Sequence, residues 1–225
     1  MKTIDIQGTL FSYEDEVLTY NDVEKITLED CISILQIVKK LFSEKEIRFA
    51  LAFGTLLGAI REKSLINGDE DVDVFIDDEV TLYKNLPFFY ENDLKLIRMK
   101  KGKLYSFRSE NGAFIDVYIL RPLKWYNIWS FYCVSLSNHY MPKKYFREYQ
   151  NIDFLGDTYL CPKAPEKLLE FWYGKTWRTP VRGHSFKYEV SSAYYWHKYY
   201  KKVKYAIQKY IGWYKWRHYV KKVSD

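Results

Sequence analysis

Residues 47–76 read IRFALAFGTLLGAIREKSLINGDEDVDVFI, and this stretch decides the fold. Its first seven residues are mostly apolar and predict a buried strand that ends before the first glycine. Residues 55–62 predict a short helix that leaves this strand. The pair Asn67-Gly68 predicts a tight turn, because both residue types tolerate positive φ. Residues 71–76 alternate polar and apolar at their start, which predicts a second strand.

Acidic side chains are placed on the predicted strands. Asp71 and Asp73 share one face of their strand, because side chains alternate with period two. Asp116 lies in the middle of another apolar strand, residues 113–120. Neighbouring carboxylates repel one another, and a divalent cation relieves that repulsion. Mg²⁺ prefers oxygen ligands and bridges carboxylates to substrate phosphates, and Mn²⁺ also fits an all-oxygen site. We therefore predict that Asp71, Asp73 and Asp116 are metal ligands and catalytic residues.

The step from the first strand into the short helix predicts a phosphate site. Gly54 lets a phosphate approach the backbone closely, and the helix that follows from Thr55 presents free amides to an anion. Arg61 and Lys63 add positive charge. For Arg61, an ion pair with the neighbouring Glu62 is an alternative that the sequence leaves open.

The remainder of the chain predicts an α+β core. Thr27 is placed to cap a helix over residues 28–43, where apolar residues recur at helical spacing. Residues 9–20 could form either a hairpin or an irregular arm. Residues 81–92 predict a partly helical stretch that is broken at Pro87. Strands are predicted at 94–100 and 103–109 about the Lys101-Gly102 turn, and a helix is predicted at 165–173. This order favours a mixed sheet flanked by helices.

Length and charge divide the chain in two. The 225 residues suit one domain with an added helical region. The chain has 35 basic and 29 acidic residues. Nine of the basic residues and one of the acidic residues lie between Tyr195 and Asp225, so the rest of the chain has 26 basic and 28 acidic residues. We predict a catalytic domain at 1–184 and a basic, aromatic helical extension at 185–225.

Cysteine spacing and hydropathy restrict the class of protein. The three cysteines show no CxxC pair, and with four scattered histidines they do not outline a zinc site. Sparse, odd cysteines fit a reducing compartment. The polar, acidic first residues predict no signal peptide, and the longest apolar stretches are too short to span a bilayer. We expect a cytoplasmic protein, peripheral to the inner face of the cell membrane if the extension binds lipid.

The segment Gly54-Thr55-Leu56-Leu57-Gly58-Ala59-Ile60-Arg61, followed by Asp69-Glu70-Asp71-Val72-Asp73-Val74, resembles the LicD family. That family includes the fukutin and fukutin-related transferases and has the nucleotidyltransferase (polymerase-β-like) fold. Its hallmark is a GTLLGAVR-type segment before a W-D-D-D-I-D-type cluster. Asn67-Gly68 stands here where the family has Pro-Trp, and Glu70 replaces the middle acid.

Two later segments carry the same resemblance. Residues 114–117 (FIDV) are similar to the family's second acidic strand. Residues 165–169 (PEKLL), with Tyr-Gly-Lys-Thr-Trp at 173–177 and Pro180, are similar to its C-terminal signature. The similarity runs from about Leu51 to Pro180. For Tyr173, Gly174 and Trp177, a helix cap and core anchor is the favoured interpretation, with substrate contact as the alternative.

The resemblance implies a reaction. Family members transfer phosphocholine or a phospho-alditol from a CDP-linked donor to a glycan hydroxyl and release CMP. Metal held by Asp71 and Asp73 would bind the donor pyrophosphate. Asp116 would complete the metal site or accept the proton of the acceptor hydroxyl, and these two roles stay open. Asp69 would order a ligand or a second metal, and Arg61 would clamp phosphate. The residues predicted to bind the donor are Gly54, Thr55, Arg61, Lys63 and Asp69.

Two other functions compete with this one. A nucleotidyltransferase would attach a nucleotide monophosphate to a small molecule or nucleic acid and would release pyrophosphate from a triphosphate. An inactive fold would serve as a basic membrane- or nucleic-acid-binding module, although the intact acidic triad argues against it.

The basic extension has interpretations of its own. Its aromatic residues recur at helical spacing, which predicts a helix packed on the domain with a solvated basic side or, alternatively, attraction to anionic lipid. Nucleic acid is not favoured, because no recognisable nucleic-acid motif accompanies the basic residues. Arg182-Gly183-His184 predicts a surface turn, with phosphate contact as the alternative. The expected partners are therefore a CDP-linked donor, a glycan or lipid-linked glycan acceptor, and a membrane surface.

Overall fold

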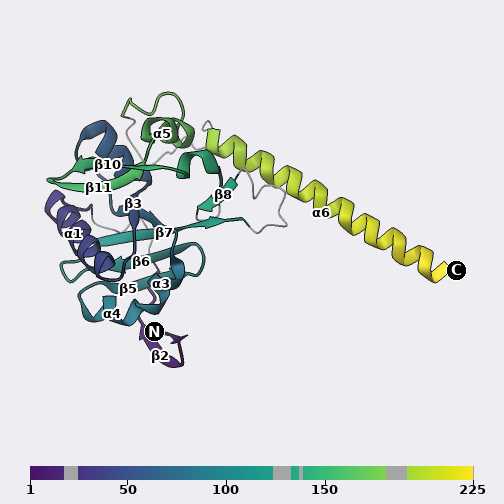
Figure 1. Cartoon of the computed structure of the whole chain (residues 1–225), viewed down its shortest axis with the longest axis horizontal. Helices are drawn as coiled ribbons and strands as arrows, with labels where there is room; N and C mark the ends of the chain where they lie inside the picture. The colour runs from purple at the N-terminus through teal and green to yellow at the C-terminus, as the bar shows by residue number, and fades with distance from the viewer. Residues whose placement is uncertain (18–24, 124–132, 137–138, 181–191, 225) are drawn as a thin grey trace.

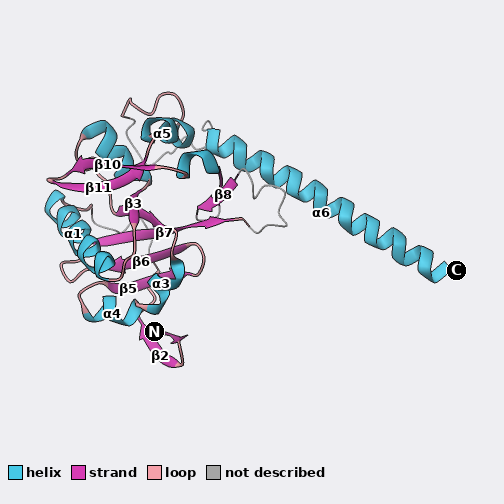
Figure 2. Cartoon of the chain, viewed as in Figure 1, coloured by secondary structure: helices cyan, strands magenta, loops and turns pink. Residues whose placement is uncertain are grey.

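A mixed β-sheet runs through the middle of the protein, with helices packed around it (Figure 1). Figure 2 separates the strands from the helices by colour. The computed structural model describes residues 1–17, 25–123, 133–136, 139–180 and 192–224. The predicted α+β class, a mixed sheet flanked by helices, is confirmed.

The sheet contains parallel and antiparallel neighbours. Seven strands follow one another in the order β10-β11-β3-β4-β7-β6-β5, and β8 and β9 extend it from β7. The pairs β11–β3 and β4–β7 are parallel, and the other pairs are antiparallel. The strands are β3 (Phe49–Leu51), β4 (Val72–Ile76), β5 (Lys95–Lys100), β6 (Leu104–Arg108), β7 (Phe114–Pro122), β8 (Cys133–Leu136), β9 (His139–Pro142), β10 (Tyr149–Phe154) and β11 (Asp157–Pro162).

The helices have the start signals that the sequence shows. Helix α1 begins where the Thr27 hydroxyl accepts a hydrogen bond from the Asp30 amide, at 3.1 Å. Helix α4 carries Pro87 in its first turn, so the expected break divides residues 79–91 into two helices. The described helices are α1 (Leu28–Glu44), α2 (Phe53–Leu57), a π-helix (Gly58–Glu62), α3 (Glu79–Lys84), α4 (Leu86–Glu91), a 3₁₀ helix (Lys143–Phe146), α5 (Pro165–Tyr173) and α6 (Ser192–Ser224).

The first strand is shorter than its apolar run predicts. The expected strand over 47–53 is confined to Phe49–Leu51, and the expected helix over 55–62 begins two residues earlier, at Phe53. Phe53 has a φ of 34°, which is unusual for a bulky residue and allows the chain to turn abruptly from strand to helix. The second half of the helix widens into a π-helix that ends at Lys63, where φ is 55°. Single π turns are frequent at functional sites.

The N-terminal segment forms a hairpin. Strand β1 (Lys2–Ile6) pairs antiparallel with β2 (Thr9–Tyr13), across Gln7 and Gly8 with φ of 54° and 86°. A two-residue turn with positive φ at both residues matches the right-handed twist of the two strands that it joins. A hairpin is therefore present, but it spans residues 2–13, and of the predicted stretch 9–20 only residues 9–13 belong to it, as its second strand.

The C-terminal helix leaves the body of the protein. Its first turns pack on α5 and β9, and the remainder extends away from the sheet (Figure 1). The interpretation of a helix packed on the domain holds for its first turns, but Tyr199, Tyr210 and Tyr214, which were expected to pack, are each more than half exposed. Among the described residues, no helix has both the length and the apolar character that crossing a membrane requires. The predicted domain boundary at 184/185 and the turn at 182–184 lie outside the described residues.

Candidate metal centre

Polar side chains form a row across four neighbouring strands. Asp73 on β4 is the register partner of Asp116 on β7. Asp116 is also the partner of Ser106 on β6, and Ser106 is the partner of Arg98 on β5. Register partners point to the same face of a sheet. The row therefore places two acids, a hydroxyl and a guanidinium side by side, between buried apolar residues of β4, β6 and β7.

The three predicted metal ligands lie together. One oxygen from each of Asp71, Asp73 and Asp116 lies within 4.8 Å of the others. Asp116 is completely buried, Asp73 is 7% exposed, and Asp71 lies at the more open edge, one residue before β4 begins. The proximity of Asp71 and Asp73 agrees with the prediction that they share one face, and the role of all three acids as ligands stays a prediction.

The electrostatics of this cluster favour a bound cation. Burial raises the pKa of Asp71 well above its ordinary value, and the charges of Asp116, Asp69 and Glu70 add to that rise. Burial also raises the pKa of Asp73, with the same sign of contribution from Asp71 and Asp116. A hard divalent ion bound between these oxygens would replace the protons, and an all-carboxylate donor set fits Mg²⁺ or Mn²⁺.

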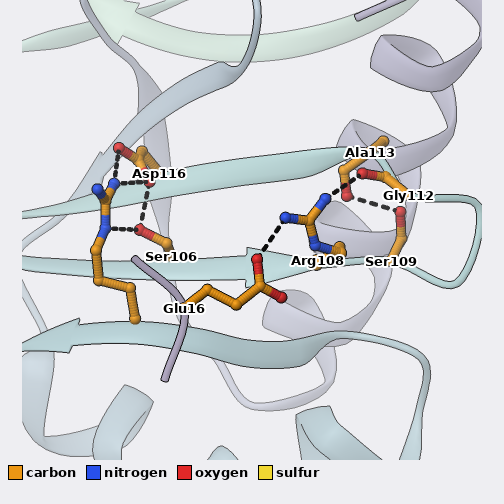
Figure 3. Close-up of polar contacts among 8 residues, drawn as sticks. Glu16, Ser106, Arg108, Ser109, Gly112, Ala113 and Asp116 are labelled. Atoms are coloured by element: carbon orange, nitrogen blue, oxygen red, sulfur yellow. Dashed lines mark hydrogen bonds and ion pairs between the residues drawn. The ribbon is translucent and has the colours of Figure 1, made fainter. Parts of the chain in front are cut away.

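Asp116 is held by a buried ion pair. The Arg98 guanidinium donates to both carboxylate oxygens of Asp116, at 3.1 and 2.9 Å, and its Nε donates to the Ser106 hydroxyl at 2.9 Å. The Ser106 hydroxyl itself donates to Asp116 (Figure 3). The Arg98 side chain is only 12% exposed. Sequence analysis did not identify Arg98 or Ser106, and the signal that reveals them is the pairing of β5, β6 and β7.

Gly54 and Thr55 fix the position of Asp73. The Gly54 amide donates to the Asp73 carboxylate at 3.1 Å, and the Thr55 hydroxyl accepts from the Asp73 amide at 2.8 Å. Thr55 is 1% exposed, so its hydroxyl faces the protein interior. The observed role of both residues is to support Asp73, and their predicted contact with a donor phosphate stays a prediction.

Phe53 brings an aromatic wall to the same edge. Its ring lies 4.8 Å from that of Tyr118 and 4.7 Å from that of Trp172, measured between centroids. Strained φ values persist only where packing enforces them, and they cluster at functional sites. Here the packing of three rings holds the residue that directly precedes Gly54.

The other predicted donor-binding residues are dispersed around the cluster. Arg61 pairs with Glu62 at 2.6 Å, as the open alternative states, and also donates to the Trp177 carbonyl at 3.0 Å. Lys63 is exposed at the end of the π-helix. Asp69 lies against Gly54, close enough to raise the pKa of Asp73. The structure therefore brings Asp69 to the acids and leaves Lys63 at the surface.

Tyr173 is a further residue of this site. Burial raises the pKa of its phenol well above the ordinary value, and the charges of Asp73 and Asp69 raise it further. The phenol is therefore within electrostatic range of the acidic cluster. The favoured interpretation as a helix cap holds for Gly174, which ends α5 with a φ of 85°. For Tyr173 the structure adds proximity to the acids.

Replacing Gly54 with alanine is expected to weaken metal binding about ten-fold or more, because supporting groups of metal ligands have effects of that size. A Cβ at Gly54 would lie 2.8 Å from Oδ2 of Asp69 and 3.4 Å from Oδ2 of Asp73. Both carboxylates would have to move. Titration of Mg²⁺ or Mn²⁺ by calorimetry measures the change. Gly212→Ala is the matched control, since a Cβ there meets only open space, and equal metal affinity in both variants would contradict the prediction.

The stabilisation of the protein by Mg²⁺ is expected to grow as pH rises. The folded-state pKa values of Asp71 and Asp73 lie above the ordinary 3.8, so the metal-free folded state binds more protons than the unfolded state. Its stability therefore falls as pH rises from about 4 through those raised values. Mg²⁺ bound to these carboxylates would prevent this loss of stability, because it would replace the protons of Asp71 and Asp73. Thermal unfolding with and without Mg²⁺ at several pH values tests this, and a gain that shrinks with rising pH would contradict it.

Comparison with known proteins places these residues in a family. The sequence model described as LicD/FKTN/FKRP, nucleotidyltransferase domain, matches residues 46–164. That range contains the acids, Gly54, Thr55 and Arg98, and it covers more than half of the chain.

Individual relatives agree with this match. The chain is 27% identical over 124 residues to uncharacterized protein RT0683 of Rickettsia typhi, covering 51% of the chain and 38% of the relative. It is 30% identical over 128 residues to uncharacterized protein RP689 of Rickettsia prowazekii, covering 49% and 48%. Over 58 residues it is 38% identical to the lipopolysaccharide cholinephosphotransferase LicD of Haemophilus influenzae, covering 24% and 22%. The chain thus spans less than half the length of these curated relatives.

A solved structure of the lincosamide antibiotic adenylyltransferase LnuA, with lincomycin bound, aligns with a TM-score of 0.45 and 12% identity, covering 65% of this chain and 86% of that one. The family assignment does not depend on it. Because the family model matches more than half of the residues, the chain belongs to the LicD/FKTN/FKRP nucleotidyltransferase domain family.

Proposed function

We propose that this protein is a metal-dependent phosphotransferase. It moves a phospho-alcohol, of the phosphocholine or phospho-alditol type, from a CDP-linked donor to a hydroxyl of a cell-surface glycan. Family membership supports a transferase. The observation that carries the more specific proposal is the convergence of Asp71, Asp73 and Asp116 within 4.8 Å in a largely buried site.

The residues of the site would have two different roles, which are metal binding and the positioning of a metal ligand. Asp71, Asp73 and Asp116 would hold Mg²⁺ or Mn²⁺, which would neutralise charge on the donor pyrophosphate. Gly54 and Thr55 hold Asp73 in place, so that its carboxylate does not have to reorganise when the donor binds. Preorganised groups of this kind lower the barrier most effectively, because they need no rearrangement during the reaction.

The transfer itself is a substitution at phosphorus. The acceptor hydroxyl oxygen forms a bond to the phosphorus that carries the alcohol, and the bond from that phosphorus to the bridging oxygen breaks. CMP leaves with the bridging oxygen, and the proton of the hydroxyl passes to a base. Little covalent chemistry is required of the protein, so positioning and charge neutralisation dominate.

The surroundings of Asp116 favour the ligand role over the base role. Both of its oxygens accept hydrogen bonds from Arg98, and its side chain has no exposed surface. A general base must come within hydrogen-bond reach of the hydroxyl that it deprotonates. Asp71, at the more open edge, is better placed to face an incoming acceptor than Asp116 is.

Thermal unfolding with a panel of nucleotides tests the proposal. The panel contains CDP-choline, CDP-glycerol, CDP-ribitol, CDP, CTP and UDP-sugars, each with and without Mg²⁺. A ligand that binds only the folded state raises the apparent stability by mass action. We expect metal-dependent stabilisation by one class of CDP-linked alcohol, absent in Asp71→Asn.

Other outcomes of this panel would change the assignment. A response to CTP alone, with pyrophosphate as the released product, would favour nucleotidyl transfer. Absence of any nucleotide response, in protein that still binds Mg²⁺, would contradict the proposed donor class. Absence of both the nucleotide response and Mg²⁺ binding would contradict the proposal that the protein is an enzyme of this kind.

A further inference from the structure

Helix α6 presents an unusual surface. It contains 33 residues, which corresponds to roughly 50 Å of helix. It begins beside α5 and β9, where Tyr200 is 3% exposed, and then runs away from the sheet (Figure 1). A helix that extends away from its domain exposes its side chains to solvent. The chemical character of those side chains therefore indicates which kind of surface the helix binds.

The described part of the helix has two different sides. At 100° per residue, one side carries aromatic and branched residues, and the opposite side carries lysines. The first side holds Trp196, Tyr199, Tyr200, Val203, Ile207, Tyr210, Ile211 and Tyr214, with Trp213 at its border. The second side holds Lys198, Lys201, Lys202 and Lys209, together with Tyr205, and Lys204 lies at the border beside Ile211. We name the first the aromatic face and the second the lysine face.

The aromatic face is open over most of its length. Tyr199, Tyr210 and Tyr214 are 62%, 64% and 52% exposed, and Ile211 and Trp213 are 47% and 48% exposed. Contiguous apolar surface of this kind marks an interaction site on a soluble domain. The face is also continuous with the buried start of the helix, so anything bound there is held at a fixed place relative to the catalytic domain.

We propose that the aromatic face docks on the surface of a bilayer that contains anionic lipids. Tyrosine and tryptophan have an apolar ring and a polar tip, and they suit the depth of lipid headgroups, where water and phosphate satisfy the tip. Lysines nearest the borders of that face, Lys202 and Lys204, can extend toward the same headgroups along their apolar stems, and the other lysines add longer-range attraction. From Tyr195 to Asp225 the chain has nine basic residues and one acid, which complements a negative surface.

A second copy of this chain fits the face less well. A dry helix–helix seam favours branched aliphatic residues, and only Val203, Ile207 and Ile211 of the aromatic face are of that kind. The tyrosine hydroxyls would need hydrogen-bond partners inside such a seam. Two strongly basic helices would also repel each other at low salt.

Vesicle co-sedimentation of the full chain tests this docking without any assay of transfer. The two vesicle types are phosphatidylcholine alone and phosphatidylcholine mixed with phosphatidylglycerol. The expected result is binding to the mixed vesicles that weakens as salt is raised. Lys202→Gln with Lys204→Gln is expected to lower the partition coefficient by about five-fold per lysine, because each lysine near an anionic surface contributes about that factor.

The matched aromatic pair of variants is decisive. Tyr210→Ala on the aromatic face is expected to weaken vesicle binding several-fold, whereas Tyr205→Ala on the lysine face removes an equally exposed tyrosine (69% against 64%) and should have a smaller effect. Equal effects of the two variants, or no binding to the mixed vesicles, would overturn the proposal. So would a concentration-dependent dimer that Tyr210→Ala abolishes in the absence of lipid binding. The readout is independent of the proposed reaction, so an inactive chain that binds vesicles would contradict only the function.

Discussion

Replacing Arg98 with methionine is expected to lower the free energy of unfolding of the metal-free protein by about 3–5 kcal/mol. The substitution removes the cation but leaves the completely buried Asp116 carboxylate without its charged partner. Chemical or thermal unfolding measures the loss, at roughly 2–4 °C in Tm for each kcal/mol in a chain of this size. Added Mg²⁺ is expected to recover part of the loss, because a bound cation would compensate the same carboxylate.

Arg108 supplies the matched control for this experiment. It is paired with Glu16 at 2.6 Å (Figure 3), but both side chains are about one third exposed. Arg108→Met should therefore cost only about 0–1 kcal/mol. In the Arg98→Met background, Asp116→Asn should restore stability, because it removes the uncompensated charge. Equal losses for the two arginine variants would show that Asp116 does not depend on Arg98 for compensation.

Local patterns were sufficient to predict the elements that carry the acids. Alternation with period two placed Asp71 and Asp73 on one face, and the turn at Asn67-Gly68 is present with a φ of 91° at the glycine. A proline in the first turn and a glycine after the last predicted α5 at the residues where it occurs. In these cases one residue type has one dominant conformational effect, so the sequence alone is informative.

Strand register was the part that local patterns left open. Arg98 faces Asp116 only because a loop of three residues, 101–103, joins β5 to β6 and a loop of five, 109–113, joins β6 to β7. A shift of one residue in either loop would move Arg98 to the opposite face. The parallel pairing of β4 with β7 closes over a long connection, and no turn residue specifies it. Counting across the two-residue turn predicted at Lys101-Gly102 would have placed Ile97 opposite Ser106. The observed loop is one residue longer and places Arg98 there instead, so the sequence prediction could not identify Arg98.

The same register explains how the acids coexist before a metal binds. Arg98 compensates Asp116, while burial and mutual repulsion raise the pKa values of Asp71 and Asp73. The fold therefore already holds the carboxylates in the arrangement that a cation would need, at a cost to its own stability. Residues kept for function often reduce stability in this way.

Replacing Asp73 with asparagine is therefore expected to change activity and stability in opposite directions. Transfer should fall by roughly 10³-fold or more, since loss of a metal ligand removes several kcal/mol of charge stabilisation. The metal-free protein should become more stable, because the substitution keeps the shape of a buried side chain and removes its repulsion with Asp71 and Asp116. Product release and thermal unfolding of the same preparation measure the two effects.

Asp77 provides the control for that pair of measurements. It follows the last residue of β4 and is exposed, so Asp77→Asn makes the same charge change at the opposite end of the same strand. Neither activity nor metal-free stability should change appreciably in that variant. A loss of stability in Asp73→Asn would contradict the prediction. It would mean that the hydrogen bond from the Gly54 amide to the carboxylate stabilises the protein more than repulsion destabilises it. The carboxylate would then have a structural role rather than a metal-binding one. Gain of stability together with loss of Mg²⁺ binding is the result that only a metal-binding carboxylate explains.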